Sequence, residues 1–288
     1  MEYHKDRFND ASMLIYKNNR LFALLPGNIE DNTFYSHQGL TYGGLLYQPD
    51  EKLEDVAMAT KAILKMLAEN GIGSIIIKDL PSIYKSVQDD TMSYLSFWLK
   101  GECYRKDVLS VIAEGKMTLS NSRKEGLKRA VKNKLRFEET DDLSIFWEKL
   151  LIPNLKTKYN KTPVHSLEEI TYLKSLFHNQ IRQFNVYYDK KLVAGATLFE
   201  TKYVAHVQYI SGNSDKNELG AIDFLHVKLI SEVFKDKHFF DFGMSHTESG
   251  QINKGLHFWK EGFGAVAITQ DFIKIKTDNY PLLDTLFA

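Results

Sequence analysis

Cysteine is almost absent from this sequence of 288 residues. The single Cys103 excludes a disulfide within the chain and any zinc or iron–sulfur site that needs several cysteines. No apolar run approaches the ~18 residues of a membrane-spanning helix, and the N-terminal MEYHKDRFNDAS lacks the apolar core of a signal peptide. Only six prolines stand against 15 Tyr, 18 Phe and 3 Trp, a composition that does not favour long disordered segments. We therefore expect a globular protein of the cytoplasm.

The chain also lacks net charge, because 37 basic side chains are balanced by 37 acidic ones. This balance argues against a protein whose whole surface binds nucleic acid, but it leaves room for a local basic patch. Such a patch is predicted over residues 123–136, where seven basic residues are opposed only by Glu125. Lys124, Lys128 and Lys132 recur at every fourth residue and so share one helix face. This face suits a phosphate-bearing ligand, and it is equally consistent with an ordinary solvated surface.

The length corresponds to two domains of about 150 residues each. A polar stretch at 116–121 is the predicted boundary, which gives domains 1–118 and 119–288. Both halves contain strand-like and helix-like patterns, so the predicted fold class is mixed α/β, with mixed sheets flanked by helices. Helices are predicted at 50–70, 89–100, 122–134, 143–159, 166–178 (with Ser166 and Glu169 as a capping box) and 219–234. Strands are predicted at 13–16, 21–25, 74–77, 106–114, 184–189, 192–200, 203–211, 239–242 and 265–276.

The stretch 241–265 has no clean periodicity and contains five glycines, two histidines, three carboxylates and two lysines. Polar loops at strand ends often carry function, although a glycine-rich connection without chemistry has a similar composition. Asp241-Phe242-Gly243 resembles the kinase metal-binding triplet, but the chain lacks the phosphate loop and the catalytic loop of kinases. The glycine strings of P-loop and dinucleotide-binding proteins are absent as well.

Metal sites and cysteine nucleophiles find little support in the sequence. His246 with Glu248, or His226 with Asp223, could share a ligand shell, but there is no H-E-x-x-H pair, and we expect no bound metal. Cys103 lies between a predicted helix and a predicted strand, with no histidine near it in sequence. We interpret it as a buried thiol rather than a nucleophile.

The stretch 241–265 resembles the closing motif of the FemAB-like branch of the GNAT acyltransferases. The matching residues are 241–245, 250–256 and 259–264. Residues 122–124, 206–209, 220–225 and 80–84 resemble further elements of the same family, so the resemblance covers most of the chain.

This resemblance implies two tandem GNAT-like domains, of which 1–118 is degenerate and 119–288 holds the acyl-transfer site. GNAT chemistry is the direct attack of an amine on an activated acyl carbonyl, without a covalent enzyme intermediate. Such a site must position the substrates, remove a proton from the ammonium and stabilise the oxyanion.

The resemblance also assigns roles to particular residues. Lys260 aligns with the lysine that is thought to stabilise the oxyanion in related aminoacyl ligases, while Trp259 replaces the usual Phe and keeps an aromatic wall. The candidate general bases are His246, Glu248 and Asp223. Residues expected to bind the substrate or the donor are Arg123, Lys124, Lys128, Gln208, Tyr209, Ser245, Asn253 and Trp259.

The expected reaction is the transfer of an acyl group from acyl-CoA to an amino group of a small molecule or a cell-envelope precursor, with nucleotide-linked acceptors included. CoA-using GNAT proteins carry Q/R-x-x-G-x-G/A after the central strand, whereas residues 214–221 contain a single glycine. Fem-type ligases use aminoacyl-tRNA and also lack this motif. Two alternatives therefore stay open: a Fem-like aminoacyl-tRNA-dependent peptidyltransferase, and a non-catalytic GNAT-fold protein that binds a ligand or a partner.

Overall fold

The computed structural model describes residues 5–114, 116–247 and 249–287, and the chain forms two compact units. The first unit is built from 1–107 and 269–288, and the second from 108–268. Strands β7 (Glu102–Ala113) and β13 (Val266–Lys276) each cross a unit boundary along the sequence. The compact units thus differ from the sequence-based division at residue 118, because the last residues of the chain pack with the first unit. No helix of the described residues is long and apolar enough to span a membrane.

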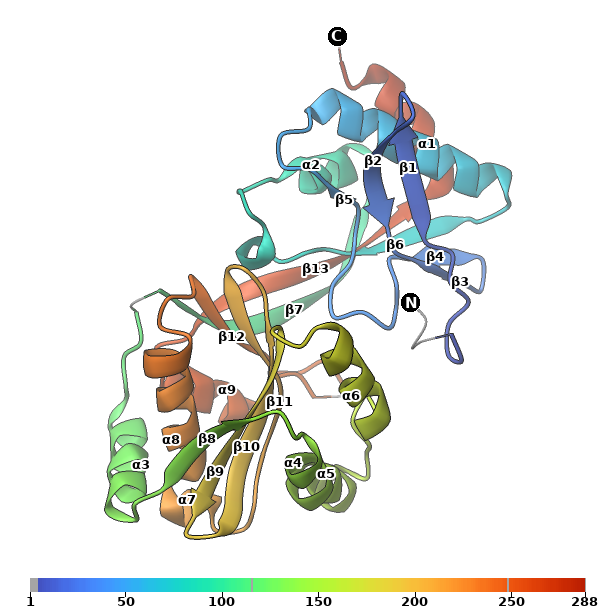
Figure 1. The fold of residues 1–288 in the computed structure, drawn as a ribbon. Coiled ribbons are helices and arrows are strands. Elements are labelled where there is room, and N and C mark those ends of the chain that lie inside the picture. The colour runs from blue at the N-terminus through green and yellow to red at the C-terminus, as the bar shows by residue number, and fades with distance from the viewer. Residues whose placement is uncertain (1–4, 115, 248, 288) are drawn as a thin grey trace. The chain divides into compact units, whose positions relative to one another are not determined.

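The first unit contains two groups of strands and a long helix (Figure 1). Besides β7 and β13, its elements are β1 (Met13–Lys17), β2 (Arg20–Leu25), β3 (Asn28–Glu30), β4 (Thr33–Tyr35), β5 (Leu46–Tyr47), α1 (Leu53–Glu69), β6 (Ser74–Lys78), η2 (Ser82–Tyr84), α2 (Thr91–Trp98) and η5 (Thr277–Thr285). Strands β1, β2 and β5 form one antiparallel sheet. Strands β4 and β6 run parallel with α1 as their crossover, and β6 also pairs antiparallel with β13.

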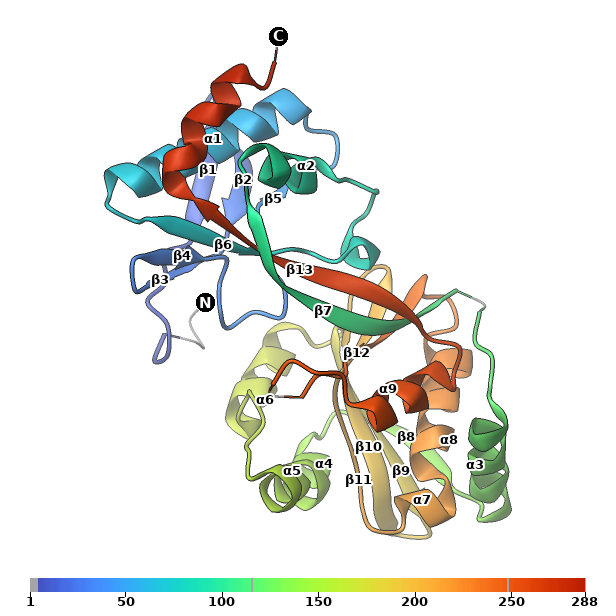
Figure 2. The same ribbon diagram turned by 180° about the vertical axis from the view of Figure 1, so that it is seen from behind.

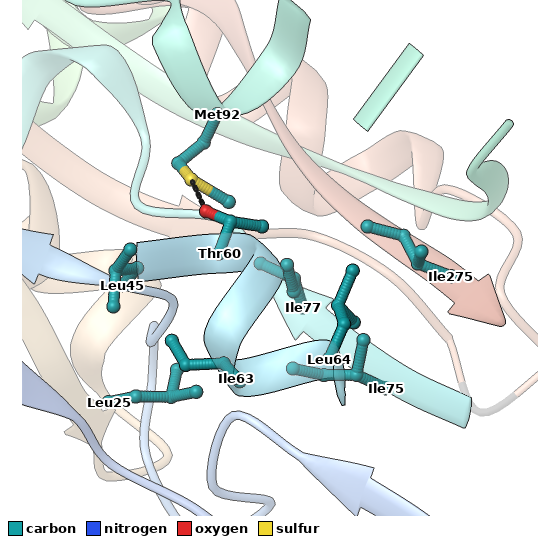
Figure 3. Close-up of a pocket in the computed structure, with 9 residues that line it drawn as sticks. All are labelled: Leu25, Leu45, Thr60, Ile63, Leu64, Ile75, Ile77, Met92 and Ile275. Carbon is teal, nitrogen blue, oxygen red and sulfur yellow. Dashed lines mark hydrogen bonds between the residues drawn. The ribbon is translucent and has the colours of Figure 1, made fainter. Parts of the chain in front are cut away.

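A small cavity lies in the apolar core of the first unit, between α1, β6 and their neighbours (Figure 3). Its volume is about 20 Å³, and its lining is aliphatic apart from Thr60 and Met92. The Thr60 hydroxyl already donates to Val56 O at 2.8 Å and approaches Met92 Sδ at 3.9 Å. A cavity that holds an ordered water needs several polar partners, so this space is a packing void and not a ligand site.

The second unit is one six-stranded sheet with helices on both faces. Besides β7 and β13, its elements are α3 (Asn121–Lys132), β8 (Arg136–Thr140), α4 (Ser144–Phe146), the π-helical turn η3 (Trp147–Leu151), α5 (Ile152–Tyr159), α6 (Leu167–Leu176), β9 (Ile181–Tyr188), β10 (Lys191–Glu200), β11 (Val204–Gly212), α7 (Lys216–Leu219), α8 (Ala221–Lys228), the π-helical turn η4 (Leu229–Val233), β12 (Phe239–Met244) and α9 (Lys254–Glu261). The strand order of the sheet is β7-β12-β11-β10-β9-β8. Figures 1 and 2 show α3 and α8 on one face of this sheet and α4 to α6 on the other.

The core of the second unit follows from the apolar runs of its central strands. β10 is buried along almost its whole length, because helices cover both of its faces. Strands β11 and β12 run parallel with α8 as their crossover, and β12 also pairs antiparallel with β7. This is the same arrangement as β4, α1, β6 and β13 in the first unit, so each unit contains one parallel pair joined by a helix and flanked by an antiparallel strand.

Most predicted elements are confirmed, including the capping box of Ser166 and Glu169 at the start of α6. The predicted helix 143–159 is present as α4, η3 and α5 in direct succession. The elements that the sequence did not predict are short, such as β4 and β8, or begin in a glycine-rich stretch, such as α9. Helix α9 starts there because the Asn253 side chain accepts a hydrogen bond from the Leu256 N–H at 3.0 Å and caps the helix.

Candidate functional site

The parallel strands β11 and β12 pair over three residues and then part. Their last pair is His206 with Asp241, after which β12 continues beside β7 through a bulge between Asp241 and Met244. Gly243 lies in this bulge with a φ of +70°, a left-handed conformation that residues with a side chain rarely adopt. Its N–H donates to Asp241 Oδ1 at 2.7 Å. The backbone beyond the last pair is therefore held in a defined bend, and no ladder to β11 follows it among the described residues.

Helix α9 places the Lys260 ammonium against this bend. Lys260 is 4% exposed, and its Nζ donates to the carbonyls of Gly243 and Met244 at 2.8 Å each. Burial lowers the pKa of Lys260 to about 8, and the negative charge of Asp241 opposes that shift. Within the described part of the chain, the ammonium has no third acceptor. It can therefore donate one further hydrogen bond, which is the property needed to stabilise an oxyanion.

The last pair of the two strands also joins two ionisable side chains. His206 Nδ1 lies 2.9 Å from Asp241 Oδ2, and both side chains are buried. The sequence marks His206 only as part of a family-like strand, so it was missed as a chemical group. The residues are far apart in the sequence, and only the pairing of β11 with β12 brings them together.

Three side-chain atoms near the strand separation are buried without a hydrogen-bond partner in the described structure. They are Gln208 Oε1, Ser245 Oγ and His246 Nδ1. Gln208 follows the last strand pair on β11, and Ser245 and His246 come directly after the end of β12. A buried polar atom without a partner loses the hydrogen bond it had in water, so these three atoms favour a polar ligand at this place.

Asp223, a predicted general base, is tied into the contact between α3 and α8. Its Oδ1 accepts from Arg123 at 2.5 Å and from Trp259 Nε1 at 3.0 Å. Burial raises the pKa of Asp223, although the bonds from Trp259 and Arg123 oppose that shift. A Cβ on Gly126 of α3 would overlap Asp223 Oδ2, so the carboxylate packs directly on the α3 backbone. These contacts join two helices and engage the oxygens that a base would need.

The start of α8 is covered by α3. Gly220, which precedes α8, is so close to Gly126 that a Cβ there would overlap the Gly126 carbonyl. The short helix α7 occupies the loop that leads to this point, and Arg129 of α3 donates to Asn217 O at 3.2 Å. An α-helix N-terminus binds phosphate through free N–H groups and a favourable dipole, but here a carboxylate, Asp223, already stands in the first turn.

The remaining predicted binding residues are spread over several elements. Lys124 and Lys128 are exposed on α3, where Lys128 also pairs with Glu125 at 2.7 Å. Tyr209 is buried on β11, and its hydroxyl lies 2.7 Å from His165 Nδ1.

The interpretation of Cys103 as a buried thiol is wrong, because the cysteine is exposed at the start of β7, where its Sγ–H donates to Arg105 O at 3.5 Å. All five residues 102–106 at the start of β7 are exposed, so neither side of the strand buries its side chains there. Glu248 lies outside the described residues, and no metal-type cluster of His, Cys, Asp or Glu occurs in the described ranges.

Comparisons with known proteins agree with this architecture. No protein-family model and no curated protein matches the chain. FemX matches in structure with a TM-score of 0.67 and 10% identity, over 98% of this chain and 92% of that chain. The C-terminal DUF2156 domain of a candidate lysylphosphatidylglycerol synthetase from Agrobacterium fabrum matches with a TM-score of 0.63 and 14% identity, over 99% and 93%. A tandem GNAT protein from the clavulanic acid biosynthesis pathway matches with a TM-score of 0.50 and 10% identity, over 94% and 85%.

At these identities the likeness concerns the fold. The chain has a FemAB-like GNAT fold, with the mixed α/β layout that the sequence predicted. The matches extend over nearly the whole chain, in agreement with the two parallel strand pairs described above.

Proposed function

We propose that the second unit transfers an acyl or aminoacyl group from an activated donor to an amino group, with Lys260 stabilising the oxyanion. The observation that carries this proposal is the ammonium of Lys260, buried and fixed on the carbonyls of Gly243 and Met244 just beyond the point where β11 and β12 part. The likeness to FemX and to the lysylphosphatidylglycerol synthetase domain supports the same class of reaction.

The chemistry needs little from the protein besides position and charge. The acceptor nitrogen attacks the acyl carbonyl, a C–N bond forms, and the C–O or C–S bond to the donor breaks. The carbonyl oxygen, now negatively charged, then accepts a hydrogen bond from the remaining N–H of Lys260. Loss of one preorganised oxyanion donor costs roughly 2.7–4 kcal/mol in other enzymes. Because the pKa of Lys260 is about 8, the side chain is mostly charged at neutral pH.

The activated donor in this reaction is either acyl-CoA or an aminoacyl-tRNA. Acyl-CoA is the expectation from the GNAT resemblance, but its pyrophosphate normally binds at the helix start that here packs under α3 and carries Asp223. We therefore favour an aminoacyl-tRNA donor, as in Fem-type ligases. The exposed lysines of α3, Lys124 and Lys128 among them, offer cationic partners for RNA phosphates. The proposed acceptor is an amino group of a cell-envelope precursor.

Radiolabelled aminoacyl-tRNAs and labelled acetyl-CoA, each incubated with the protein and a panel of amine acceptors, test this proposal. Product formation from aminoacyl-tRNA, with binding that weakens steeply as salt rises, is the expected result. Product from acetyl-CoA alone would establish acyl-CoA as the donor. Binding of a donor without turnover under any condition would favour the non-catalytic alternative.

The variant Lys260→Met tests the role of the lysine. We expect its kcat/KM to fall roughly 100- to 1,000-fold, the loss typical of one oxyanion donor. Lys254→Met is the matched control, because Lys254 is exposed at the start of the same helix. Equal activity of the two variants would show that Lys260 does not stabilise the oxyanion.

A further inference from the structure

His206 and Asp241 form a buried pair that the roles proposed above leave unused. The Asp241 side chain is 1% exposed and the His206 side chain 11%, with Nδ1 at 2.9 Å from Oδ2. A carboxylate only accepts hydrogen bonds, so Nδ1 carries the proton and Nε2 carries the lone pair. Among the described residues none bonds to Nε2. The pair thus presents a basic nitrogen, with residual exposure, where β11 and β12 part.

Gly243 links this pair to Lys260. Its N–H donates to Asp241 Oδ1 at 2.7 Å, and its carbonyl accepts from Lys260 Nζ at 2.8 Å. One residue with a left-handed backbone therefore orients the carboxylate on one side and the ammonium on the other. Asp241 of β12 is the charged group in contact with the imidazole and also interacts with the Lys260 ammonium of α9, while β10 places the uncharged Phe199 opposite His206.

We propose that His206 is the general base for the acceptor amine and that Asp241 is its positioning residue, an inference that rests on the proposed function. As the C–N bond forms, a proton moves from the attacking nitrogen to His206 Nε2. The C–O or C–S bond to the donor breaks, and the imidazolium returns the proton to the leaving oxygen or sulfur. Asp241 stays ionised throughout and stabilises the imidazolium through the Nδ1–H.

The other basic groups of the site are less suited to this step. Both oxygens of Asp223 are engaged, one by Arg123 and Trp259 and the other by packing on Gly126. His246 has a buried Nδ1 and no carboxylate partner recorded among the described residues. Only His206 combines an orienting carboxylate with an uncommitted second nitrogen in the part of the chain that the structure describes.

Rate measurements over pH 5–9 with His206→Gln and Asp241→Asn test the inference, and His178→Gln, an exposed histidine after α6, is the control. General-base catalysis contributes roughly 100- to 10,000-fold, so His206→Gln should lose that factor in kcat and the acid limb of its pH profile. Asp241→Asn should lose part of the rate, since an amide can donate to Nδ1 and turn the basic nitrogen away from the substrate. His178→Gln should behave as the wild type.

Nitrogen NMR of the wild-type imidazole gives a second readout that needs neither turnover nor a variant that folds. The expected tautomer has the proton on Nδ1. The assignment would be overturned by a proton on Nε2 of the resting neutral ring, or by a His206→Gln variant with the wild-type rate and pH profile. In either case, transfer by the wild type would leave the proposed function intact. Absence of transfer by the wild type from every donor would reject both.

Discussion

The buried ammonium of Lys260 makes the stability of the protein depend on pH in a way that can be measured without a substrate. Burial lowers the pKa of Lys260 from its ordinary 10.5 to about 8. Each pH unit between these values is equivalent to about 1.36 kcal/mol, so the native charged form carries a cost of about 3 kcal/mol relative to the unfolded chain. The side chain is only 4% exposed, so screening by solvent reduces this figure little.

The direction of the effect follows from the number of bound protons. Below pH 8 both states hold the proton, and the cost of burying the charge is fully present. Between pH 8 and 10.5 the unfolded chain binds the proton and the native protein does not, so the free energy of unfolding rises with pH. Above 10.5 neither state is charged and the rise ends.

Lys260→Met is the variant that isolates this contribution. It removes the buried charge but also leaves the carbonyls of Gly243 and Met244 without a donor, which costs about 1–3 kcal/mol for each buried group. These effects oppose each other at pH 7, so the absolute stability of the variant is a poor test. The difference between wild type and variant is a better one, because the remaining ionisable groups titrate in both proteins.

Urea unfolding of wild type, Lys260→Met and Lys254→Met at pH 7, 8, 9 and 10 provides the assay. Between pH 7 and 10, the free energy of unfolding of the wild type should rise by about 2–3 kcal/mol more than that of Lys260→Met. Lys254 is exposed, and its variant should follow the wild type at every pH. A constant difference between wild type and Lys260→Met would mean that the lysine is not held as a buried cation, and it would remove the physical basis of its proposed role.

Two further predictions concern packing. Gly126→Ala should destabilise the protein by about 1–3 kcal/mol in urea unfolding, because the new Cβ overlaps the fixed Asp223. Gly255→Ala is the control, because Gly255 lies on the open side of α9 and its substitution should not destabilise the protein. Equal stabilities of the two variants would contradict the close contact of α3 with α8. Deletion of residues 269–288 should abolish amide hydrogen-exchange protection in α1, at the opposite end of the sequence, because these residues supply the fully buried Ile275 to the core of the first unit; retained protection in α1 would refute this division of the chain.

The sequence predicted best the parts of the fold that depend on local signals. The strong apolar runs of β9 to β11 and the capping box of α6 are read from neighbouring residues, and both are confirmed. The return of the C-terminal residues to the first unit could not be predicted, since it depends on which strands pair across most of the chain length. The three-residue strand β4 was missed for a related reason, because its stability comes from pairing with β6 rather than from its own composition.

The candidate site shows the same limit. Lys260 was singled out because it belongs to a recognisable stretch, and the structure shows that its side chain is buried. The position of Asp223 against Arg123 depends on how α3 packs on α8, and nothing in either helix alone reveals it. His206 and Asp241 become one chemical unit only through the register of β11 and β12.

The contrast between the two parallel strand pairs explains why chemistry is expected in one unit only. In the first unit the backbone beyond the last pair of β4 and β6 is closed: Ser36 N–H donates to Ile76 O, the Ser36 hydroxyl accepts the Lys78 N–H at 2.8 Å, and Gly43 N–H donates to Lys78 O at 2.9 Å. These backbone and hydroxyl groups bond to one another, so a ligand would have to displace existing bonds to reach them. In the second unit the equivalent place keeps three buried side-chain atoms, of Gln208, Ser245 and His246, without a partner among the described residues. Because unsatisfied buried polar groups are costly, we expect them where a ligand completes them, and we therefore expect the proposed reaction beyond the separation of β11 and β12.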